Sequence, residues 1–290
     1  MTRVAVLTPD PSDPSYVGQW PTVLERLGKA LAQTGIEVVP TPWTDHVEDA
    51  SGLKDFPLVL ALIVWGYHRD HGRWLTATRT WAEAGVPLAN PATVLGWNSD
   101  KAYLARLETA GVPIPPTVWT DHATQGQVDA AFDRLGAETL IVKPAVSGGA
   151  WKTTRLNRGK ALTDAPTGRA LIQPYLPTIA TEGETSLLFF GGRLSHAVNK
   201  RPVGGDFRIQ VQYGGLYETV EPPPAALALA ERVLAAVEEP LLYARIDMTP
   251  DANGNWLLME AELIEPDFYL GNDPAGGRLF AEAVRARLGA

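Results

Sequence analysis

Two groups of residues in this 290-residue chain combine residue types and spacing that could carry chemistry. In the first, IVKPAVSGGAW, an apolar run ends on Lys143 and leads into a loop that contains Ser147, Gly148 and Gly149. A lysine supplies a cation, and glycines allow backbone amides to approach phosphate oxygens without interference from a Cβ atom. The segment therefore predicts a phosphate-binding loop, with an ordinary surface turn as the alternative. Its spacing fits neither a Walker P-loop nor a dinucleotide fingerprint.

The second group is acidic and lies near the C-terminus. Asp247 belongs to one apolar run, and Glu260 and Glu262 belong to the next. Side chains two residues apart on a strand share a face, so both glutamates could meet Asp247 from the neighbouring strand. Three converging carboxylates are costly unless a cation neutralises them, and hard oxygen ligands suit a Mg²⁺ ion that bridges nucleotide phosphates. We therefore expect a metal site here, with a solvated strand face as the alternative.

The apolar pattern around these groups predicts strands and helices in three parts. Residues 1–97 resemble a small βαβαβ layer, residues 98–172 an α+β lobe with the glycine loop, and residues 173–290 a second α+β lobe with the acidic group. Strands are expected at 3–7, 36–39, 58–65, 139–144, 185–190, 194–199, 241–248 and 256–263. Helices are expected before Gly35, at 74–84, 100–110 and 125–135, before residue 238, and at 274–288.

Composition excludes several classes of function. Acidic residues outnumber lysine and arginine by 33 to 25, which leaves a formal charge of −8 and gives no basic surface for nucleic acid or anionic membranes. Cysteine is absent, so disulfides, thiolate nucleophiles and Cys-rich zinc sites are excluded. No apolar stretch approaches the roughly 20 residues that span a bilayer, and the N-terminus does not read as a signal peptide. A cytoplasmic protein with a small-molecule ligand is the simplest expectation.

The order of these motifs resembles the ATP-grasp superfamily, and within it the glutathione-synthetase-like branch, over nearly the whole chain. The resemblance implies an ATP-grasp fold of mixed α/β and α+β class, in which a Rossmann-like first domain precedes two lobes that clamp ATP. Glu262 departs from the family, which more usually carries asparagine there, so the number of bound metal ions stays open. Pro174 has no amide to give adenine, so the donor of the hinge must be a neighbour such as Leu176.

The resemblance also assigns roles to single residues. ATP would be bound by the early lysine of NSDK, the glycine loop, a hinge and a ribose-binding acid, namely Lys101, Lys143, Ser147, Gly148, Gly149, Gln173, Tyr175, Leu176 and Glu184. For Tyr175 a place in the core is the alternative. Metal would be bound by Asp247, Glu260 and Glu262. The catalytic candidates, Lys200, Arg201 and Arg208, follow from the segment NKRPVGGDFR, because family members bring this stretch to the transferred phosphate. Solvated surface cations are the alternative.

Substrate contacts are expected from the first domain, because ligands bind at the carboxyl ends of parallel strands. The candidates are Ser15, Tyr16, Tyr67, His68 and Arg69, and a capping or surface histidine is the alternative for His68.

The implied activity is that of an ATP-dependent carboxylate–amine ligase that uses ATP and Mg²⁺, with Mn²⁺ as a substitute. The runs VSGGAW, QPYLP with EGE, and GDFR further resemble cyclo-ligases that close O-ureidoserine into D-cycloserine. Cyclisation of an amino-acid-like substrate and intermolecular ligation both remain open. An ATP-grasp kinase and a non-catalytic nucleotide-binding module are the alternatives. Neither nucleic acid nor membrane is expected as a partner, and a homodimer is the assembly that family members often form.

Overall fold

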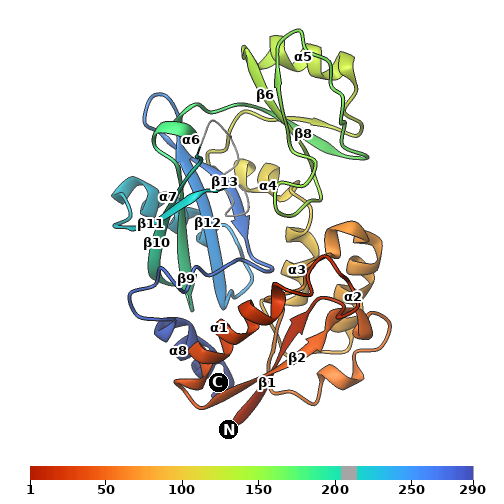
Figure 1. The fold of residues 1–290 in the computed structure, drawn as a ribbon, viewed down its shortest axis with the longest axis vertical. Coiled ribbons are helices and arrows are strands. Elements are labelled where there is room, and N and C mark those ends of the chain that lie inside the picture. Colours follow the sequence, from red (N-terminus) through yellow and green to blue (C-terminus); the bar gives the residue numbers. More distant parts are fainter. Residues whose placement is uncertain (204–213, 290) are drawn as a thin grey trace.

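The computed structural model describes residues 1–203 and 214–289, which form three sheets with helices packed on them (Figure 1). The first sheet is parallel and has the strand order β2-β1-β3-β4. Its strands are β1 (Thr2–Thr8), β2 (Ile36–Pro42), β3 (Val59–Leu60) and β4 (Leu88–Ala89). Its helices are α1 (Trp20–Ala32), α2 (His71–Glu83) and the 3₁₀ turns η1 (Trp43–His46), η2 (Ser51–Leu53) and η3 (Tyr67–Arg69). Because β2 and β3 lie on opposite sides of β1, the order reverses between β1 and β3, where open α/β sheets bind ligands.

The second sheet is antiparallel, with the order β5-β8-β6-β7. It is formed by β5 (Val118–Thr120), β6 (Thr139–Pro144), β7 (Thr154–Asn157) and β8 (Ala170–Pro174), with α5 (Gln125–Leu135) on one face. A capping box between Thr124 and Gln127 starts α5, and Gly136 ends it in the left-handed region. These local signals explain why the predicted helix 125–135 and strand 139–144 match the structure.

The third sheet is also antiparallel and has the order β11-β10-β9-β12-β13. Its strands are β9 (Glu184–Phe190), β10 (Arg193–Arg201), β11 (Leu216–Val220), β12 (Tyr243–Pro250) and β13 (Trp256–Glu262). The helices of this part are α6 (Thr178–Thr181), α7 (Pro224–Ala235) and α8 (Arg278–Leu288). Gly191 and Gly192, with φ of 56° and 75°, form the two-residue turn that joins β9 to β10.

Two short helices, α3 (Ala92–Asn98) and α4 (Tyr103–Thr109), connect the first sheet to the others (Figure 1). The helix expected at 100–110 is present as α4, although it begins only at Tyr103, whereas α3 was not expected. Asn98 ends α3 rather than starting the next helix, since its side chain donates to the carbonyl of Ala261 at 2.9 Å and accepts from the amide of Leu263 at 3.0 Å. The polar residue therefore joins α3 to β13.

Two other expected elements are shorter in the structure. The apolar run 58–65 is buried almost throughout, but only Val59 and Leu60 pair as a strand, because the following residues cross from the sheet into the loop before η3. The C-terminal helix begins at Arg278 instead of residue 274, because Gly276 and Gly277 have φ of 59° and 82°. Within the described residues, every helix is too short or too polar to cross a membrane.

The hydrophobic cores connect the first and third sheets. One buried cluster combines Val4 and Val6 of β1 with Leu188 and Phe190 of β9 and Phe280 of α8. In contrast, the core of the second sheet is formed, within the described part of the chain, by residues between 118 and 172. The first and third sheets are thus packed as one body, to which the second sheet is attached (Figure 1).

Candidate active site

The charged residues of β12 and β13 lie side by side by strand register. Asp247 pairs directly with Glu260, and Arg245 pairs directly with Glu262. On the other side of β12, Asp247 pairs with Ser186 of β9. The antiparallel pairing therefore brings these polar side chains onto neighbouring positions of three strands.

Asp247 is the most extensively bonded of these acids. Its side chain is 3% exposed, accepts a 2.5 Å hydrogen bond from Ser186 Oγ, and forms an ion pair with Arg245 Nη2 at 2.9 Å. The ammonium of Lys200 lies 3.5 Å away. Burial favours the neutral acid, but the Arg245 guanidinium and the Lys200 ammonium outweigh it and lower the pKa of Asp247 to about 2. Asp247 is therefore a fixed anion.

Lys200 joins Asp247 to Glu184, the predicted ribose-binding acid. Lys200 Nζ lies 2.6 Å from Glu184 Oε1, and both side chains are almost fully buried. Burial opposes the charge on Lys200, yet Asp247 and Glu184 together raise its pKa well above the usual range. Lys200 is therefore a permanent cation that lies between the carboxylates of Asp247 and Glu184.

Lys101 brings three distant segments together. Its ammonium forms an ion pair with Glu260 Oε1 at 3.0 Å and donates to the carbonyl and hydroxyl oxygens of Ser147 at 3.2 and 3.3 Å. Its backbone amide donates to the carbonyl of Ala145 at 2.8 Å. The early lysine, the glycine loop and the acidic strand therefore meet at one point.

Lys143 belongs to the same group of charges. Burial lowers its pKa to about 8, while Glu260 raises it and Lys101 lowers it further. A lysine in this state remains a cation at neutral pH and gains from a nearby anion, which is the requirement for binding a phosphate.

Of the three acids, Glu262 is the one whose ionised form is least stabilised by its surroundings. Its carboxylate forms an ion pair with Arg245, yet burial, with Glu260 and Asp247 nearby, raises its pKa to about 8 against the effect of Arg245. Burial and the two neighbouring carboxylates therefore outweigh the stabilisation that Arg245 gives to the charged form of Glu262.

Within the described residues, no group of three or more His, Asp or Glu side chains already has metal-binding geometry, so the expected metal site of Asp247, Glu260 and Glu262 stays a prediction. Each acid is instead held by a lysine or an arginine. The donor set still fits a divalent cation, since Asp247 and Glu260 face each other in register and offer hard oxygens.

The hinge residues follow β8. Gln173 is buried and donates to Thr117 Oγ1 at 2.9 Å, and the amide of Tyr175 donates to the carbonyl of Thr139 at 2.9 Å. The Arg155 guanidinium lies 4.0 Å from the centre of the Tyr175 ring. Since Pro174 has no amide hydrogen, Leu176 is the hinge residue whose amide finds no acceptor among the described residues.

Arg201 and Arg208 are the other two catalytic candidates of this segment. Arg201 ends β10, is exposed, and donates from Nε to Asn199 Oδ1 at 3.0 Å. Arg208 lies outside the described residues. Lys200 is therefore the candidate of this segment whose position beside the acids is established.

The substrate candidates of the first domain flank the switch point between β1 and β3. Arg69 Nη1 bonds to Asp13 Oδ2 and to Ser15 Oγ, each at 3.1 Å, and its guanidinium lies 4.8 Å from the centre of the Tyr16 ring. Tyr16 in turn packs on Trp65, with ring centres 5.6 Å apart. The loops after the two strands thus form one continuous wall.

Tyr67 and His68 of η3 approach the other two parts. Tyr67 is buried against Trp74, with ring centres 4.9 Å apart, and burial near Glu265 and Glu260 raises the pKa of its hydroxyl. The imidazole of His68 is so near the glycine loop that a Cβ atom on Gly148 would meet its Nδ1 at 3.3 Å. Burial, then Arg69 and Lys101, lower the pKa of His68 to about 4, which keeps the imidazole neutral.

Sequence reasoning missed three residues of this site. Arg245 stands two residues before Asp247, and the alternation of a strand could have shown that both face the same way. Tyr269 has a φ of 46° and places its ring 5.8 Å from Lys200 Nζ and 5.2 Å from the Arg245 guanidinium. Glu265 follows β13, and burial raises its pKa to about 7 although Arg245 lowers it. Neither Tyr269 nor Glu265 belongs to a repeating pattern that could have revealed it.

Comparisons with known proteins show what the chain is similar to. The family model "D-cycloserine synthetase DcsG, N-terminal domain" matches residues 4–90. The cycloserine biosynthesis protein DcsG of Streptomyces lavendulae is 27% identical, over 90% of this chain and 92% of that protein. The glutathione synthetase of Prochlorococcus marinus (strain MIT 9313) is 28% identical, over 92% of this chain and 86% of that enzyme.

Solved structures extend the likeness to the whole chain. The crystal structure of D-cycloserine synthetase DcsG superposes with a TM-score of 0.79 and 26% identity and covers 99% of both chains. The D-alanine–D-alanine ligase of Bacillus anthracis, 16% identical, gives 0.71 over 99% of both chains. The chain is an ATP-dependent ligase with an ATP-grasp fold. For this ligase, the expected fold class and enzyme class are both confirmed.

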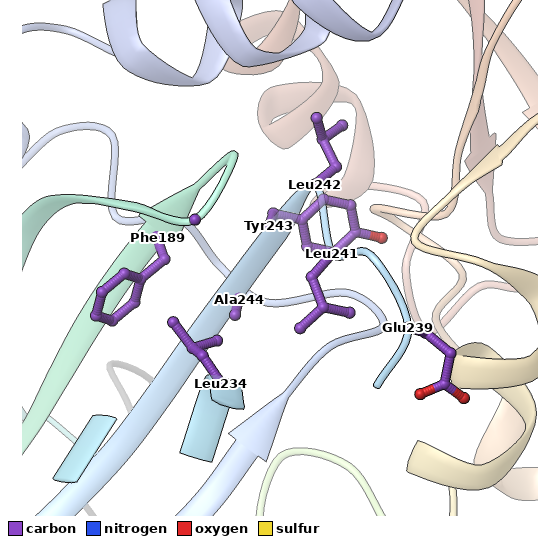
Figure 2. A pocket seen from close by; sticks show the side chains of 8 residues that line it. Phe189, Leu234, Glu239, Leu241, Leu242, Tyr243 and Ala244 are labelled. Carbon is purple, nitrogen blue, oxygen red and sulfur yellow. The ribbon is translucent and has the colours of Figure 1, made fainter. Parts of the chain in front are cut away.

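One cavity of the ligase lies away from the charged residues of this site. It has a volume of about 140 Å³ and lies between β9, α7 and the segment that leads into β12, where Phe189, Leu234 and Leu241 line it (Figure 2). Its lining is mostly apolar, with Glu239 as a charged member, and it shares no residue with the site of Lys101, Asp247 and Glu260.

Proposed function

We propose that this ligase uses ATP to activate a small carboxylate as an acyl phosphate, which an amine nitrogen then attacks. The observation that carries the proposal is the meeting of Lys101 with Glu260 and Ser147, beside Lys200, Arg245 and Asp247. Several cations and fixed acids around one point are what a triphosphate and its metal require.

Each residue has a proposed role. Lys101, Lys143 and the amides of Ser147, Gly148 and Gly149 hold the phosphates, while Gln173, Tyr175, Leu176 and Glu184 bind the nucleoside. Asp247, Glu260 and Glu262 would hold Mg²⁺, which neutralises charge on the phosphates when bound. Solved relatives with the same fold support this assignment, since one binds ATP and another binds Mg and ADP. Mn²⁺ is proposed as a substitute.

The chain's own residues then position the reaction. Lys200 and Arg245 neutralise the charge that develops as a carboxylate oxygen attacks the γ-phosphorus and the bond to ADP breaks. The amine nitrogen next attacks the carbonyl carbon, phosphate leaves, and the amine loses a proton. Arg201 and Arg208 are proposed to assist at the same phosphate. No protein nucleophile is needed, because positioning and charge neutralisation suffice.

The relationship to D-cycloserine synthetase supports an intramolecular version of this reaction, in which the activated carboxyl and the nitrogen belong to one O-ureidoserine-like molecule. The relationship to glutathione synthetase supports an intermolecular version. We also propose the domain division 1–97, 98–172 and 173–290, a cytoplasmic location and a homodimeric assembly.

ADP release from the purified ligase with Mg·ATP tests the proposal against a panel of amino acids and amines, with O-ureidoserine included and products identified by mass spectrometry. Release with O-ureidoserine alone, and a product lighter by the atoms lost on ring closure, supports the cyclo-ligase. Release with pairs of substrates supports intermolecular ligation. Release without any nitrogen acceptor, accompanied by a stable phosphorylated product, would identify a kinase instead.

A further inference from the structure

The segment that follows β13 crosses the charged face of the third sheet. Its backbone carbonyls accept hydrogen bonds from side chains of β12, β10 and β11, namely from Arg245 Nη1 to Asp267 at 3.3 Å, from His196 Nε2 to Phe268 at 3.0 Å and from Thr219 Oγ1 to Asn272 at 2.8 Å. Side chains an even number of residues apart on a strand share a face, so this segment lies on the face that carries Asp247 and Lys200. We call residues 266–272 the strap.

The ring of Tyr269, in the middle of the strap, lies beside two cations of this face. Its centre is 5.2 Å from the Arg245 guanidinium and 5.8 Å from Lys200 Nζ. It also stands at 88° to the ring of Tyr217, the residue of β11 that pairs with Lys200, with ring centres 5.2 Å apart. Cation–π and edge-to-face contacts are attractive, so they hold the ring in place. An aromatic ring of the strap therefore covers the two cations that the proposed reaction places at the transferred phosphate.

The backbone of Tyr269 adopts a conformation that suits glycine better than tyrosine. Its φ is 46°, which is uncommon for a bulky residue and costs energy. Two local hydrogen bonds hold it there, since its amide donates to Asp267 Oδ1 at 2.9 Å and its carbonyl accepts from the amide of Asn272 at 2.7 Å. Glycine would take this φ without strain, and strained residues concentrate at functional sites. The aromatic side chain, and not the backbone, is therefore what a function of this position would use.

The proposed reaction gives such a ring a task. Water that attacks the carbonyl carbon of the acyl phosphate displaces phosphate, as the amine does, and returns the free carboxylate. ATP is then consumed without formation of a C–N bond, so the site must exclude water until the amine attacks. The strap is placed for this purpose, because Tyr269 covers Lys200 and Arg245 while Phe268 packs with Leu27 of the first domain in one buried cluster.

We infer that the Tyr269 ring keeps water away from the acyl phosphate and so couples ATP cleavage to C–N bond formation. The inference rests on the proposed function and adds to it the residue that protects its intermediate. Tyr269 takes part in neither bond-forming step. It is a positioning residue that acts through the space that its ring fills beside Lys200 and Arg245.

The test is the ratio of ADP released to C–N product formed by the purified full chain. Serine, alanine and O-ureidoserine are supplied with Mg·ATP and hydroxylamine, which converts acyl phosphates into hydroxamates that are counted together with any cyclic product. Tyr269→Phe keeps the ring and is the matched control. Tyr269→Gly and Tyr269→Asn remove the ring and tolerate a positive φ, so that at least one of them is expected to fold, which urea unfolding checks.

The wild type and Tyr269→Phe are expected to release ADP and form C–N product in nearly equal amounts. The folded variants without the ring should release about fivefold or more ADP for each C–N bond, because water then reaches the intermediate. A purely structural defect would lower ADP release and product formation in the same proportion, so this ratio reports the protection itself.

The outcomes separate this inference from the proposed function. An unchanged ratio in folded Tyr269→Gly or Tyr269→Asn would retain the ligase and overturn the role of the ring. A ratio that rises as much in Tyr269→Phe would also overturn it, since the ring is still present in that variant. A wild type that forms no C–N product with any of these carboxylates would count against the ligase reaction and, with it, against the inference.

Discussion

At the scale of single residues, the acids of the site differ in how much structure depends on them. Asp247 is buried between Arg245, Lys200 and Ser186, whereas the side chain of Glu260 is 33% exposed and pairs with Lys101. Removing one partner from a buried charge network leaves the others uncompensated and costs about 3–5 kcal/mol, while a partly exposed pair contributes about 1 kcal/mol or less.

Asp247→Asn is therefore expected to lower the free energy of unfolding by about 3 kcal/mol, and Glu260→Gln by about 1 kcal/mol. If both acids bind Mg²⁺, both variants lose nearly all ADP release. Urea unfolding and turnover measured on the same preparations check this. Full turnover in the folded Glu260→Gln variant would contradict the metal assignment, and this variant is the cleaner probe because it disturbs the fold less.

His68 gives the site a pH dependence. Its pKa is lowered from 6.5 to about 4 in the folded protein, mainly by burial, so between these values the unfolded chain binds a proton that the folded chain does not. The stability associated with neutral His68 is thus complete above about pH 6.5 and declines as the pH falls toward 4. His68→Gln should unfold at urea midpoints that depend less on pH across this window. Equal pH dependence in the two proteins would show that His68 is not buried as described.

At the scale of secondary-structure elements, Gly183 controls how β9 and β10 present Glu184 and Lys200. Its φ is 81°, and a Cβ atom there would meet Asn199 Oδ1 at 2.6 Å and the carbonyl oxygen of Lys200 at 2.7 Å. Gly254 has a similar φ of 83° but open space around it. The two glycines therefore separate backbone strain from steric collision.

Gly254→Ala is expected to cost about 1 kcal/mol, which is the strain of a left-handed conformation. Gly183→Ala should cost about 3 kcal/mol or more, because backbone atoms of β10 must also move, and it should reduce turnover by displacing Lys200. Urea unfolding of both variants, with ADP release, makes the comparison. Equal losses of stability would mean that β9 and β10 are not packed as closely as described.

Some secondary-structure elements could be predicted from the sequence, and others could not. Helix α5 and strand β6 carry their caps and alternation locally, and the acidic group of β12 and β13 follows from a period of two residues, so these were predictable. The break between α3 and α4 and the brevity of β3 were not, because they depend on contacts with segments far along the chain, such as the bonds of Asn98 to β13.

At the scale of the whole molecule, Asn90 shows why the first and third sheets behave as one body. Its side-chain amide donates to the carbonyls of Tyr243 and Leu263 at 2.9 and 2.8 Å, and its carbonyl accepts from the amide of Leu242 at 2.7 Å. These bonds are buried and lie beside the shared core of β1, β9 and α8. Among the described residues, the second sheet has a buried core of its own, and Trp119 of β5 packs against the core of the third sheet. Its polar links to the rest include those of Lys101 and Asp100, and His68 lies close to Gly148.

This difference predicts how the molecule opens. Residues 118–174 should separate from the rest of the molecule as a unit. The free energy of this opening should be lower than that of the first and third sheets, because the separation exposes few apolar side chains. In hydrogen exchange, amides of β6 and β8 should therefore exchange faster than those of β1 and β12 and with a weaker dependence on urea.

Addition of Mg²⁺ with a non-hydrolysable ATP analogue should slow the exchange of β6 and β8 strongly, since the nucleotide would join Lys143 on one side to Asp247 and Glu260 on the other. Lys101→Met should weaken this protection, whereas Mg²⁺ alone should not produce it. Identical exchange free energies for β6 and β1, with and without nucleotide, would show that the three sheets form a single rigid unit and that the site does not close by movement of the second sheet.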